Sequence, residues 1–528
     1  PYQRRATGQL AWKSHQPVRF PDQGKGVCET AKIGRTLSKE AYKAEEEELR
    51  TELLEAQIAL REREIPVYVI IAGMEGAGKG EVVNALDEWL DARGMHIYAF
   101  WEETDEEKYR PQAWRFWRAM PRRGEIGVFF GGWYLSPIEQ RFTGRWSDAD
   151  LDQSMRGIRE LERMLIHDGA VIVKCWYHFS ENEQRRRLKA LERNDRSRWK
   201  MMPKKSKFSE QYRRFEAVAA QVVRRTDIGR APWHIIEATD PRYRNMTTGR
   251  VLLREIQDAL ATAQNEDAAE AAPSSTDWDM LPQAPEARIT LIDRVDLTQT
   301  IGKGAYRKRL ADLQAELNEL AWRAHALKIS TVFVFEGVDA AGKGGAIRRI
   351  TQAVDARLRE VISIAAPTDE ERDHHYLWRF WRHLPRAGRM TIFDRSWYGR
   401  VLVERVEGFT SHDNWARAYL EINDFEEQLV QAGVVVQKFW LQISKEEQMT
   451  RFKAREDTPY KRYKITDEDW RNREKWDEYR EAVNEMLART DVGHAPWNLI
   501  AGNDKKFARI QVLETITDAL RDALKGRA

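Results

Sequence analysis

The chain has 528 residues, with 87 Lys and Arg against 84 Asp and Glu and a formal net charge of +3 at pH 7. This length allows two or more domains, and the near balance of charge does not by itself predict a polyanion partner. Two cysteines, Cys28 and Cys175, are too few for a disulfide framework. No apolar run reaches the roughly 18 residues of a membrane span. The first residues lack the apolar core of a secretory signal, so we expect a soluble cytoplasmic protein with no membrane partner.

The first strong pattern is an amphipathic helix over Lys39–Glu62, followed by an apolar run, Pro66–Ile70, that is typical of a buried parallel strand. The next residues, Ile71–Gly80, read IAGMEGAGKG. A strand, a glycine loop ending in Gly-Lys and a following helix form the layout of a phosphate-binding P-loop. The chain therefore contains a candidate phosphate site early in its first half.

The second half repeats the first at a fixed offset. Lys79 and Lys343, the lysines of two such loops, are 343 − 79 = 264 positions apart. The same offset relates Trp114–Arg118 to Trp378–Arg382, Trp133 to Trp397, Trp176 to Trp440, and Thr226 to Thr490. A fixed offset over this distance indicates a duplicated domain. We expect domains at 1–263 and 289–528, joined by a linker at 264–288 that is rich in Ala, Pro, Ser and acidic residues.

Strands alternate with helices in each copy. In the second copy the predicted strands are Thr331–Phe335, Val361–Ile364, Met390–Phe393, Val434–Leu441 and Trp497–Ala501. The predicted helices are Lys303–Lys328, Gly345–Leu358, Asn414–Ala432, Lys445–Arg455, Asp467–Arg489 and Phe507–Leu524. This alternation predicts a parallel sheet covered on both faces. The expected fold is α/β, a tandem duplication of a three-layer α/β/α domain with a parallel sheet.

The loop of the second copy is Phe335–Gly345, FEGVDAAGKGG. Its glycines let the backbone curl so that successive N–H groups point at an anion, and the helix N-terminus and Lys343 add positive charge. The candidate phosphate-binding residues of this loop are Gly337, Ala340, Ala341, Gly342, Gly344 and Gly345. Gly344 stands where the motif usually has Ser or Thr for Mg²⁺. Asp339 is then the nearby oxygen ligand for a metal, directly or through water.

The strand Met390–Phe393 ends in Asp394-Arg395-Ser396. An acid at the carboxyl end of a strand beside the P-loop holds Mg²⁺ or a metal-bound water in phosphoryl-transfer sites. The alternative is that Asp394 only caps a loop. Arginines close by can bind phosphate oxygens as bidentate forks; the candidates are Arg395, Arg400 and Arg405. Glu404 is either an ion-pair partner or a ligand contact.

The first copy lacks this acidic element. Phe130, Gly131 and Gly132 stand at the positions of Asp394, Arg395 and Ser396, and Glu75 stands for Asp339. Without the carboxylate the transferring group loses its metal clamp. We therefore expect the second copy to be catalytic. We expect the first copy to have weak or no catalytic activity, and either to bind a polyanion or only to pack against the second copy.

A basic segment, Arg451–Lys464, is a candidate lid over the phosphates. Its basic residues are Arg451, Lys453, Arg455, Lys461, Arg462 and Lys464. The alternative is a solvated basic surface. The segment Trp378–Arg382 could stack on a base, but it recurs in both copies. We therefore favour a buried aromatic helix with Arg379 or Arg382 directed toward the phosphate cleft.

Together these segments resemble the polyphosphate kinase 2 family, in its two-domain class. The resemblance rests on GVDAAGKGG (337–345), APTDEE (366–371), LWRFWRHLPRAG (377–388), FDRSWYGRVLVERV (393–406) and TDVGHAPW (490–497). It implies a P-loop kinase-like fold in each copy, with a thymidylate kinase-like sheet and a helical lid. It also implies transfer of a terminal phosphoryl group from inorganic polyphosphate to AMP, giving ADP. By position it implies Mg²⁺ at Asp339 and Asp394, phosphates held by Lys343, and Arg395 between donor and acceptor. Asp469 is a third candidate for the metal neighbourhood.

Other readings remain open at this point. ADP or GDP could be the acceptor, the chain could be an ATP-dependent nucleoside monophosphate kinase, or it could be a polyanion-binding scaffold without activity. We expect inorganic polyphosphate and AMP or ADP as partners and no nucleic acid. A pseudo-twofold pair of domains is expected to substitute for a homodimer, and whole chains could associate further.

Overall fold

The computed structural model describes residues 31–193, 211–268, 290–458, 465 and 467–525. The chain forms two compact units, one of residues 1–102, 119–272 and 373–375 and the other of residues 103–118, 273–372 and 376–528. The sequence predicts domain boundaries at 263 and 289, and these stay predictions. Among the described residues, no helix combines the length and apolar character that a membrane span needs.

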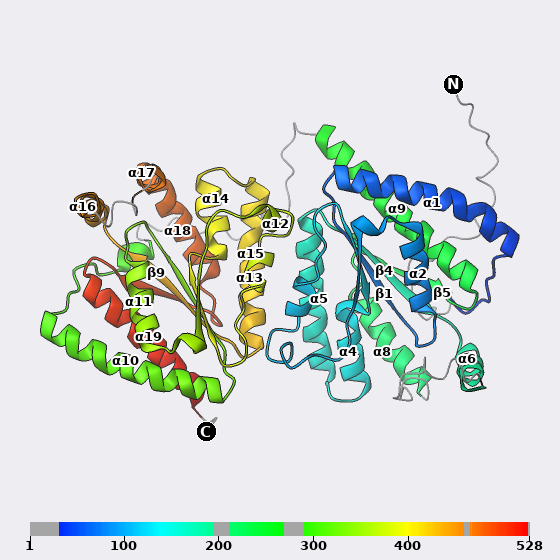
Figure 1. Cartoon of the computed structure of the whole chain (residues 1–528), viewed down its shortest axis with the longest axis horizontal. Coiled ribbons are helices and arrows are strands. Elements are labelled where there is room, and N and C mark those ends of the chain that lie inside the picture. The colour runs from blue at the N-terminus through cyan, green and yellow to red at the C-terminus, as the bar shows by residue number, and fades with distance from the viewer. Residues whose placement is uncertain (1–30, 194–210, 269–289, 459–464, 466, 526–528) are drawn as a thin grey trace. The chain divides into compact units, whose positions relative to one another are not determined.

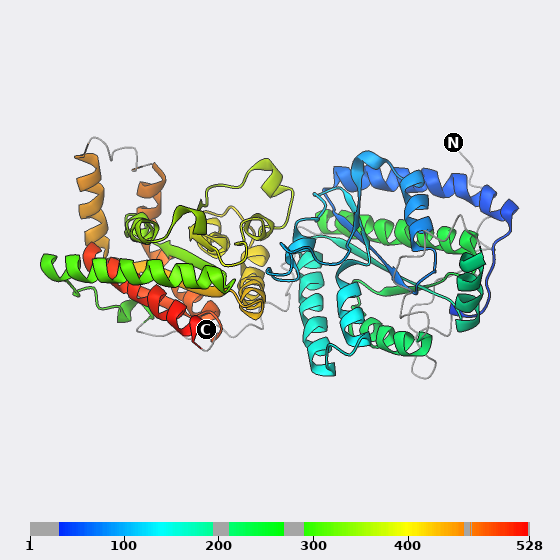
Figure 2. The same ribbon diagram turned by 60° about the horizontal axis from the view of Figure 1, so that its bottom comes forward.

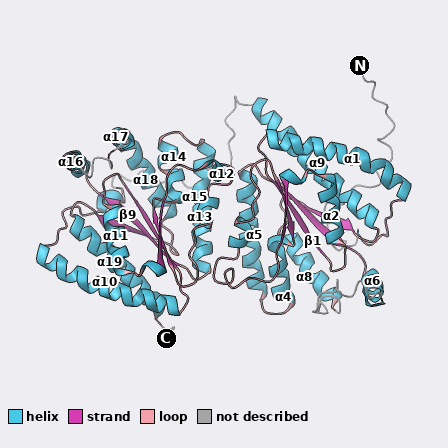
Figure 3. Ribbon diagram, in the orientation of Figure 1, coloured by secondary structure: helices cyan, strands magenta, loops and turns pink. Residues whose placement is uncertain are grey.

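The first unit contains a five-stranded parallel sheet in the order β2-β3-β1-β4-β5. Its strands are β1 (Val67–Gly73), β2 (Met95–Ala99), β3 (Ile126–Phe130), β4 (Val171–His178) and β5 (Trp233–Glu237). Helices cover both faces (Figure 3). On one face lie α1 (Lys39–Glu62), α2 (Lys79–Trp89) and α9 (Pro241–Ala268), and on the other lie α4 (Leu135–Phe142), α5 (Asp148–His167) and α8 (Tyr212–Arg225). Among the residues that the structure describes, this copy also has the α-helices α3 (Trp114–Trp117) and α6 (Glu181–Arg193).

The second unit has the same design, with a five-stranded parallel sheet in the order β10-β9-β6-β8-β7 (Figure 1). Its strands are β6 (Thr331–Gly337), β7 (Arg359–Ser363), β8 (Met390–Asp394), β9 (Val435–Gln442) and β10 (Trp497–Ala501). The longer helices are α10 (Lys303–Ala326), α11 (Lys343–Ala353), α15 (His412–Gln431), α16 (Lys445–Glu456), α18 (Trp476–Thr490) and α19 (Lys505–Leu524). Shorter helices are α12 (Asp369–Arg372), α13 (Trp378–Trp381), α14 (Val403–Val406) and α17 (Asp467–Glu474). The predicted α/β fold with parallel sheets is therefore confirmed.

The core of the second unit lies between the sheet and the layer of α10, α11 and α19. α10 and α19 run side by side in this layer (Figure 2). Leu313, Leu317 and Leu320 form the apolar stripe of α10, as the helical spacing predicts, and they are buried. The opposite face of the sheet is covered by α15 and α18. This packing leaves the carboxyl ends of β6 and β8 facing the loops that carry the site.

Two predicted helices differ from the structure by more than two residues at an end. The helix predicted over Gly345–Leu358 is α11, which ends at Ala353, and a separate 3₁₀ helix, Ala356–Leu358, follows it. The region 467–489 forms two helices, α17 and α18, that are separated at Lys475 with φ −88° and ψ 28°. The ammonium of Lys475 pairs with Glu407 at 3.1 Å. The break lets α17 take its own direction over the phosphate loop. In the first copy, α9 continues to Ala268, past the predicted start of the linker, and the rest of that linker lies outside the described residues.

Candidate active site

The phosphate loop of the second copy connects β6 to α11. Gly337 has φ +148°, and a Cβ there would lie 2.6 Å from the carbonyl oxygen of Leu441, so only glycine fits. Gly342 has φ +116° and caps the N-terminus of α11. The Lys343 ammonium donates a hydrogen bond to the Gly337 carbonyl. The loop therefore curls around the start of a helix, which is a ready-made anion site.

Arg395 joins the end of β8 to this loop. β8 pairs with β6 so that Asp394 lies opposite Phe335. The next residue, Arg395, has φ +66°, and its Nη2 lies 3.4 Å from Asp339 Oδ1. Burial opposes the charge of Arg395, but the surrounding acids, Asp339 first, outweigh it and raise its pKa. The two segments that the sequence predicted to form one site are thus in contact.

Helix α17 adds two residues, Asn472 and Glu468, that the sequence motifs do not predict. Asn472 Nδ2 donates to Asp339 Oδ2 at 2.8 Å, and the Tyr479 hydroxyl donates to Asn472 Oδ1 at 3.2 Å. Glu468 Oε1 lies 3.5 Å from Arg395 Nη1. The predicted third acid, Asp469, is the next residue and is buried in α17, with 9% of its surface exposed. Consecutive residues of a helix point about 100° apart around its axis. The sequence alone therefore does not show which of the two acids faces Arg395.

Glu336, the residue before Gly337, is a further missed residue. It is buried, and its Oε1 accepts a hydrogen bond of 2.8 Å from the Ser396 hydroxyl. Burial raises the pKa of Glu336, although the nearby Lys343 opposes the shift. A comparison of the two copies could have identified Glu336, because the first copy has Ala72 at the equivalent position. It differs between the copies together with Asp394, Arg395 and Ser396.

The acids present fit a hard divalent cation only in combination with substrate. Among the described residues, no group of three or more His, Cys, Asp or Glu side chains is placed to hold a metal ion. Asp339 and Asp394 remain as oxygen donors at the ends of neighbouring strands. Mg²⁺ is commonly bound by one or two carboxylates, with phosphate oxygens and waters completing its shell. The two-acid set therefore fits Mg²⁺ on a phosphate substrate.

The outer arginines that the sequence predicted as phosphate ligands lie in ion pairs. Arg382 pairs with Glu370 at 3.1 Å, Arg400 with Glu404 at 3.2 Å, and Arg405 with Glu485 at 2.6 Å. Trp378, Phe380 and Trp381 of α13 are buried, which favours the aromatic-helix reading. Contact of these arginines with phosphate stays a prediction.

The lid is described only in part. Arg451 is buried in α16, and Arg455 is half-buried in the last turn of that helix. Lys461 and Lys464 lie outside the described residues, so their proposed contact with phosphate stays a prediction.

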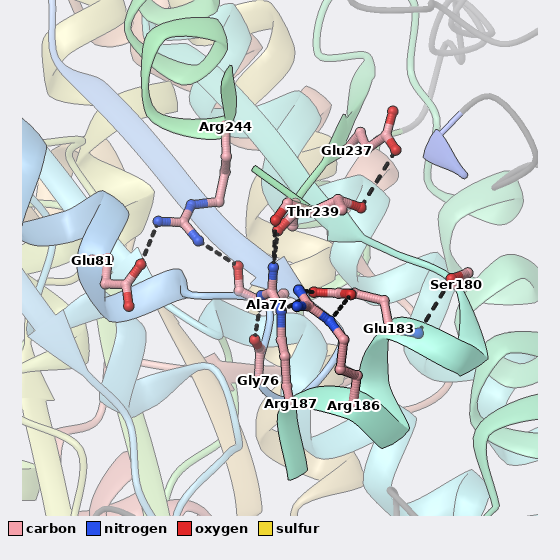
Figure 4. A network of polar contacts seen from close by, with 11 residues as sticks. Gly76, Ala77, Glu81, Ser180, Glu183, Arg186, Arg187, Glu237, Thr239 and Arg244 are labelled. Atoms are coloured by element: carbon pink, nitrogen blue, oxygen red, sulfur yellow. Dashed lines mark hydrogen bonds and ion pairs between the residues drawn. The ribbon is translucent and has the colours of Figure 1, made fainter. Parts of the chain in front are cut away.

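The first copy keeps the loop without the acidic element. Lys79 Nζ donates to the carbonyls of Gly73 and Met74 at 3.0 and 2.9 Å. Burial lowers the pKa of Lys79 to about 8, and Glu75 opposes this shift. Gly131 and Gly132 follow β3 with φ +82° and +48° and offer no side chain. Two arginines, Arg187 and Arg244, brace the outer side of this loop (Figure 4).

A phosphate loop at a helix N-terminus, with an acid and an arginine at the end of the neighbouring strand, defines a P-loop enzyme of phosphoryl transfer. The family model Polyphosphate kinase 2 matches residues 36–264 and 300–528. The chain belongs to the polyphosphate kinase 2 family, and it contains two copies of the family's domain.

Relatives match over nearly the whole chain. The polyphosphate:AMP phosphotransferase of Pseudomonas aeruginosa is 50% identical over 501 residues, which are 94% of this chain and 99% of the relative. The protein of that name from Acinetobacter johnsonii is 37% identical over 90% of this chain and 96% of its own. A crystal structure described as a polyphosphate kinase 2 from Pseudomonas aeruginosa superimposes with a TM-score of 0.83. It is 47% identical and covers 94% of this chain and 99% of its own.

Proposed function

We propose that this chain transfers the terminal phosphoryl group of inorganic polyphosphate to AMP, giving ADP and a shortened polymer, and that the reaction takes place in the second copy. The observation that carries the proposal is the contact between Arg395 and Asp339, which joins the phosphate loop to the strand end bearing Asp394. The full-length relatives named polyphosphate:AMP phosphotransferase support the donor and the acceptor.

The reaction needs mainly correct placement of the two substrates and neutralisation of the charge on their phosphates. An AMP phosphate oxygen is already anionic near neutral pH, so it attacks without a strong general base. Lys343 and the loop N–H groups hold the donor phosphates, and Arg395, which is 45% exposed, reaches the transferring group. Asp339 and Asp394 would hold Mg²⁺, which neutralises charge on the phosphates.

The test is a product assay with a matched variant. The purified chain is incubated with Mg²⁺, with AMP, ADP or GDP as acceptor, and with polyphosphate or ATP as donor. We expect ADP from polyphosphate and AMP, and its loss when EDTA removes the metal. D394N should nearly abolish this product because the amide is a weaker metal ligand than the carboxylate. Product only from ATP, only with ADP or GDP, or an unchanged rate in D394N would contradict the proposal.

A further inference from the structure

Arg451 has every guanidinium donor occupied. An arginine offers five N–H groups. Nε donates to Glu447 Oε1 at 2.6 Å. Nη1 donates to the carbonyls of Ala340 and Ala341 at 2.9 and 2.8 Å, and Nη2 to those of Gly502 and Asn503 at 2.6 and 2.9 Å. Only 3% of the residue's surface is exposed. No N–H group of Arg451 is left for a phosphate oxygen.

The position of these acceptors explains what the contact does. The C=O and N–H of a trans peptide point in opposite directions. Drawing the Ala341 carbonyl toward Arg451 therefore turns the N–H of Gly342 to the opposite side of the loop, where an anion binds. Ala340 holds φ +62°, a left-handed conformation that is unfavourable for a residue with a Cβ and needs a restraint. The guanidinium on its carbonyl supplies that restraint.

The first copy repeats the contact with different side chains. Arg187, 264 positions before Arg451, donates to the carbonyls of Gly76 at 2.8 Å and of Ala238 and Thr239 at 2.7 and 2.8 Å. The equivalent of the Ala341 carbonyl, that of Ala77, accepts instead from Arg244 at 3.1 Å (Figure 4). Both copies thus place a guanidinium on the same two loop carbonyls.

This contact is present in both copies, although only the second copy has the acid Asp394 at the end of the neighbouring strand. Arg244 is 1% exposed and pairs with Glu81 at 2.6 Å. In the second copy Ala508 and Gly345 stand at the positions of Arg244 and Glu81, so Arg451 alone covers both carbonyls. A contact that is kept while its partners change indicates that the loop depends on it.

We propose that Arg451 is a positioning residue that holds the phosphate loop of the second copy in its binding shape, and that it does not itself touch polyphosphate. The proposal rests on the proposed function of that copy. It gives Arg451 a different role from the other basic residues of the lid segment.

Variants of Arg451 separate the effect of its charge from the effect of its hydrogen-bond geometry. A lysine keeps the charge, but its three N–H groups radiate from one nitrogen atom, so it lacks the planar five-donor fork that spans the four carbonyls and Glu447. We expect R451K and R451M to lower kcat alike, on the order of 10²-fold, because the loop misplaces the donor phosphates. R187K removes the matching brace in the first copy and is expected to lower the melting temperature while keeping the rate. If R451M does not fold by circular dichroism, R451K decides.

A direct phosphate contact gives a different result. R451K would then stay near wild type while R451M would raise KM for polyphosphate, with a defect that shrinks at high salt. Calorimetric titration with tripolyphosphate makes the test independent of turnover. We expect R451K to weaken binding at least about tenfold and R187K to leave the tightest site unchanged. If the wild type makes no ADP, the proposed function fails, and the titration still decides. Equal affinity in R451K and wild type, or no binding to wild type, overturns the proposal.

Discussion

Two non-glycine residues beside the phosphate site hold left-handed backbone conformations, Ala340 at φ +62° and Arg395 at φ +66°. The first copy has glycine at both positions, Gly76 and Gly131. Such a conformation costs a side-chain-bearing residue about 1–3 kcal/mol and persists where the surroundings enforce it. The cost of keeping Arg395 there is consistent with a need for its guanidinium. The motif predicts which residue types meet at the site, but it does not predict this backbone strain.

Glu336 gives a pH-dependent prediction. Burial raises the pKa of Glu336. The side chain therefore stabilises the folded protein fully at pH values below the ordinary pKa of a glutamate, and this stabilisation is lost as the pH rises through the raised value. As the pH rises through the raised value, the ionised, buried carboxylate becomes a cost, so the melting temperature of E336Q should gain on that of wild type toward higher pH. The advantage should shrink toward lower pH. Melting curves by circular dichroism measure it, and the absence of such a gain toward higher pH would sink this account of Glu336.

The segment after β8 is anchored by a buried network that both copies share. In the second copy Lys438 pairs with Glu426 at 2.8 Å, both side chains fully buried, and Trp397 and Tyr398 donate to the same carboxylate at 3.0 and 2.7 Å. The first copy has Lys174 and Glu162 at 2.7 Å with Trp133 and Tyr134. The Trp-Tyr pair therefore occurs in both copies because it anchors the segment after the strand. This role does not depend on Asp394.

Removing one ion of this network should be costly. K438M leaves the Glu426 carboxylate buried without its counter-ion, and we expect a loss of about 3–5 kcal/mol in the unfolding free energy of the second copy. K174M should destabilise the first copy similarly. K525M, at a pair on the surface, is the control and should leave melting unchanged. Scanning calorimetry measures all three; K438M behaving like K525M would contradict a structural role for the network.

At the level of elements, prediction succeeded where the physics is local. The strand Trp497–Ala501 and the helix Lys39–Glu62 are predicted with the bounds observed, because the spacing of apolar residues is visible in the chain. Candidates such as Asn472 and Glu468 were missed, since their role depends on how α17 crosses the loop. Helix direction after a break such as Lys475 is decided by tertiary contacts that no local pattern encodes.

At the scale of the whole molecule, duplication separates what folds the domain from what operates the site. The five-stranded sheet, the curled loop, its guanidinium brace and the buried Lys–Glu pair occur in both copies. The four residues Glu336, Asp394, Arg395 and Ser396 occur in the second alone. A duplicated domain can lose its chemistry while keeping its fold, because the sheet and the buried Lys–Glu pair form in the first copy without these residues. Association of whole chains stays a prediction.

The most direct measurement compares the two loop lysines in the full chain. Lys343 and Lys79 occupy equivalent positions, so K343A and K79A remove the same charge from the same kind of loop. With polyphosphate, AMP and Mg²⁺, K343A should lower kcat on the order of 10²–10³-fold, as loss of a charge-stabilising donor does, while K79A should keep most of the wild-type rate. Equal losses in the two variants, or a larger loss in K79A, would contradict the claim that the second copy performs the reaction.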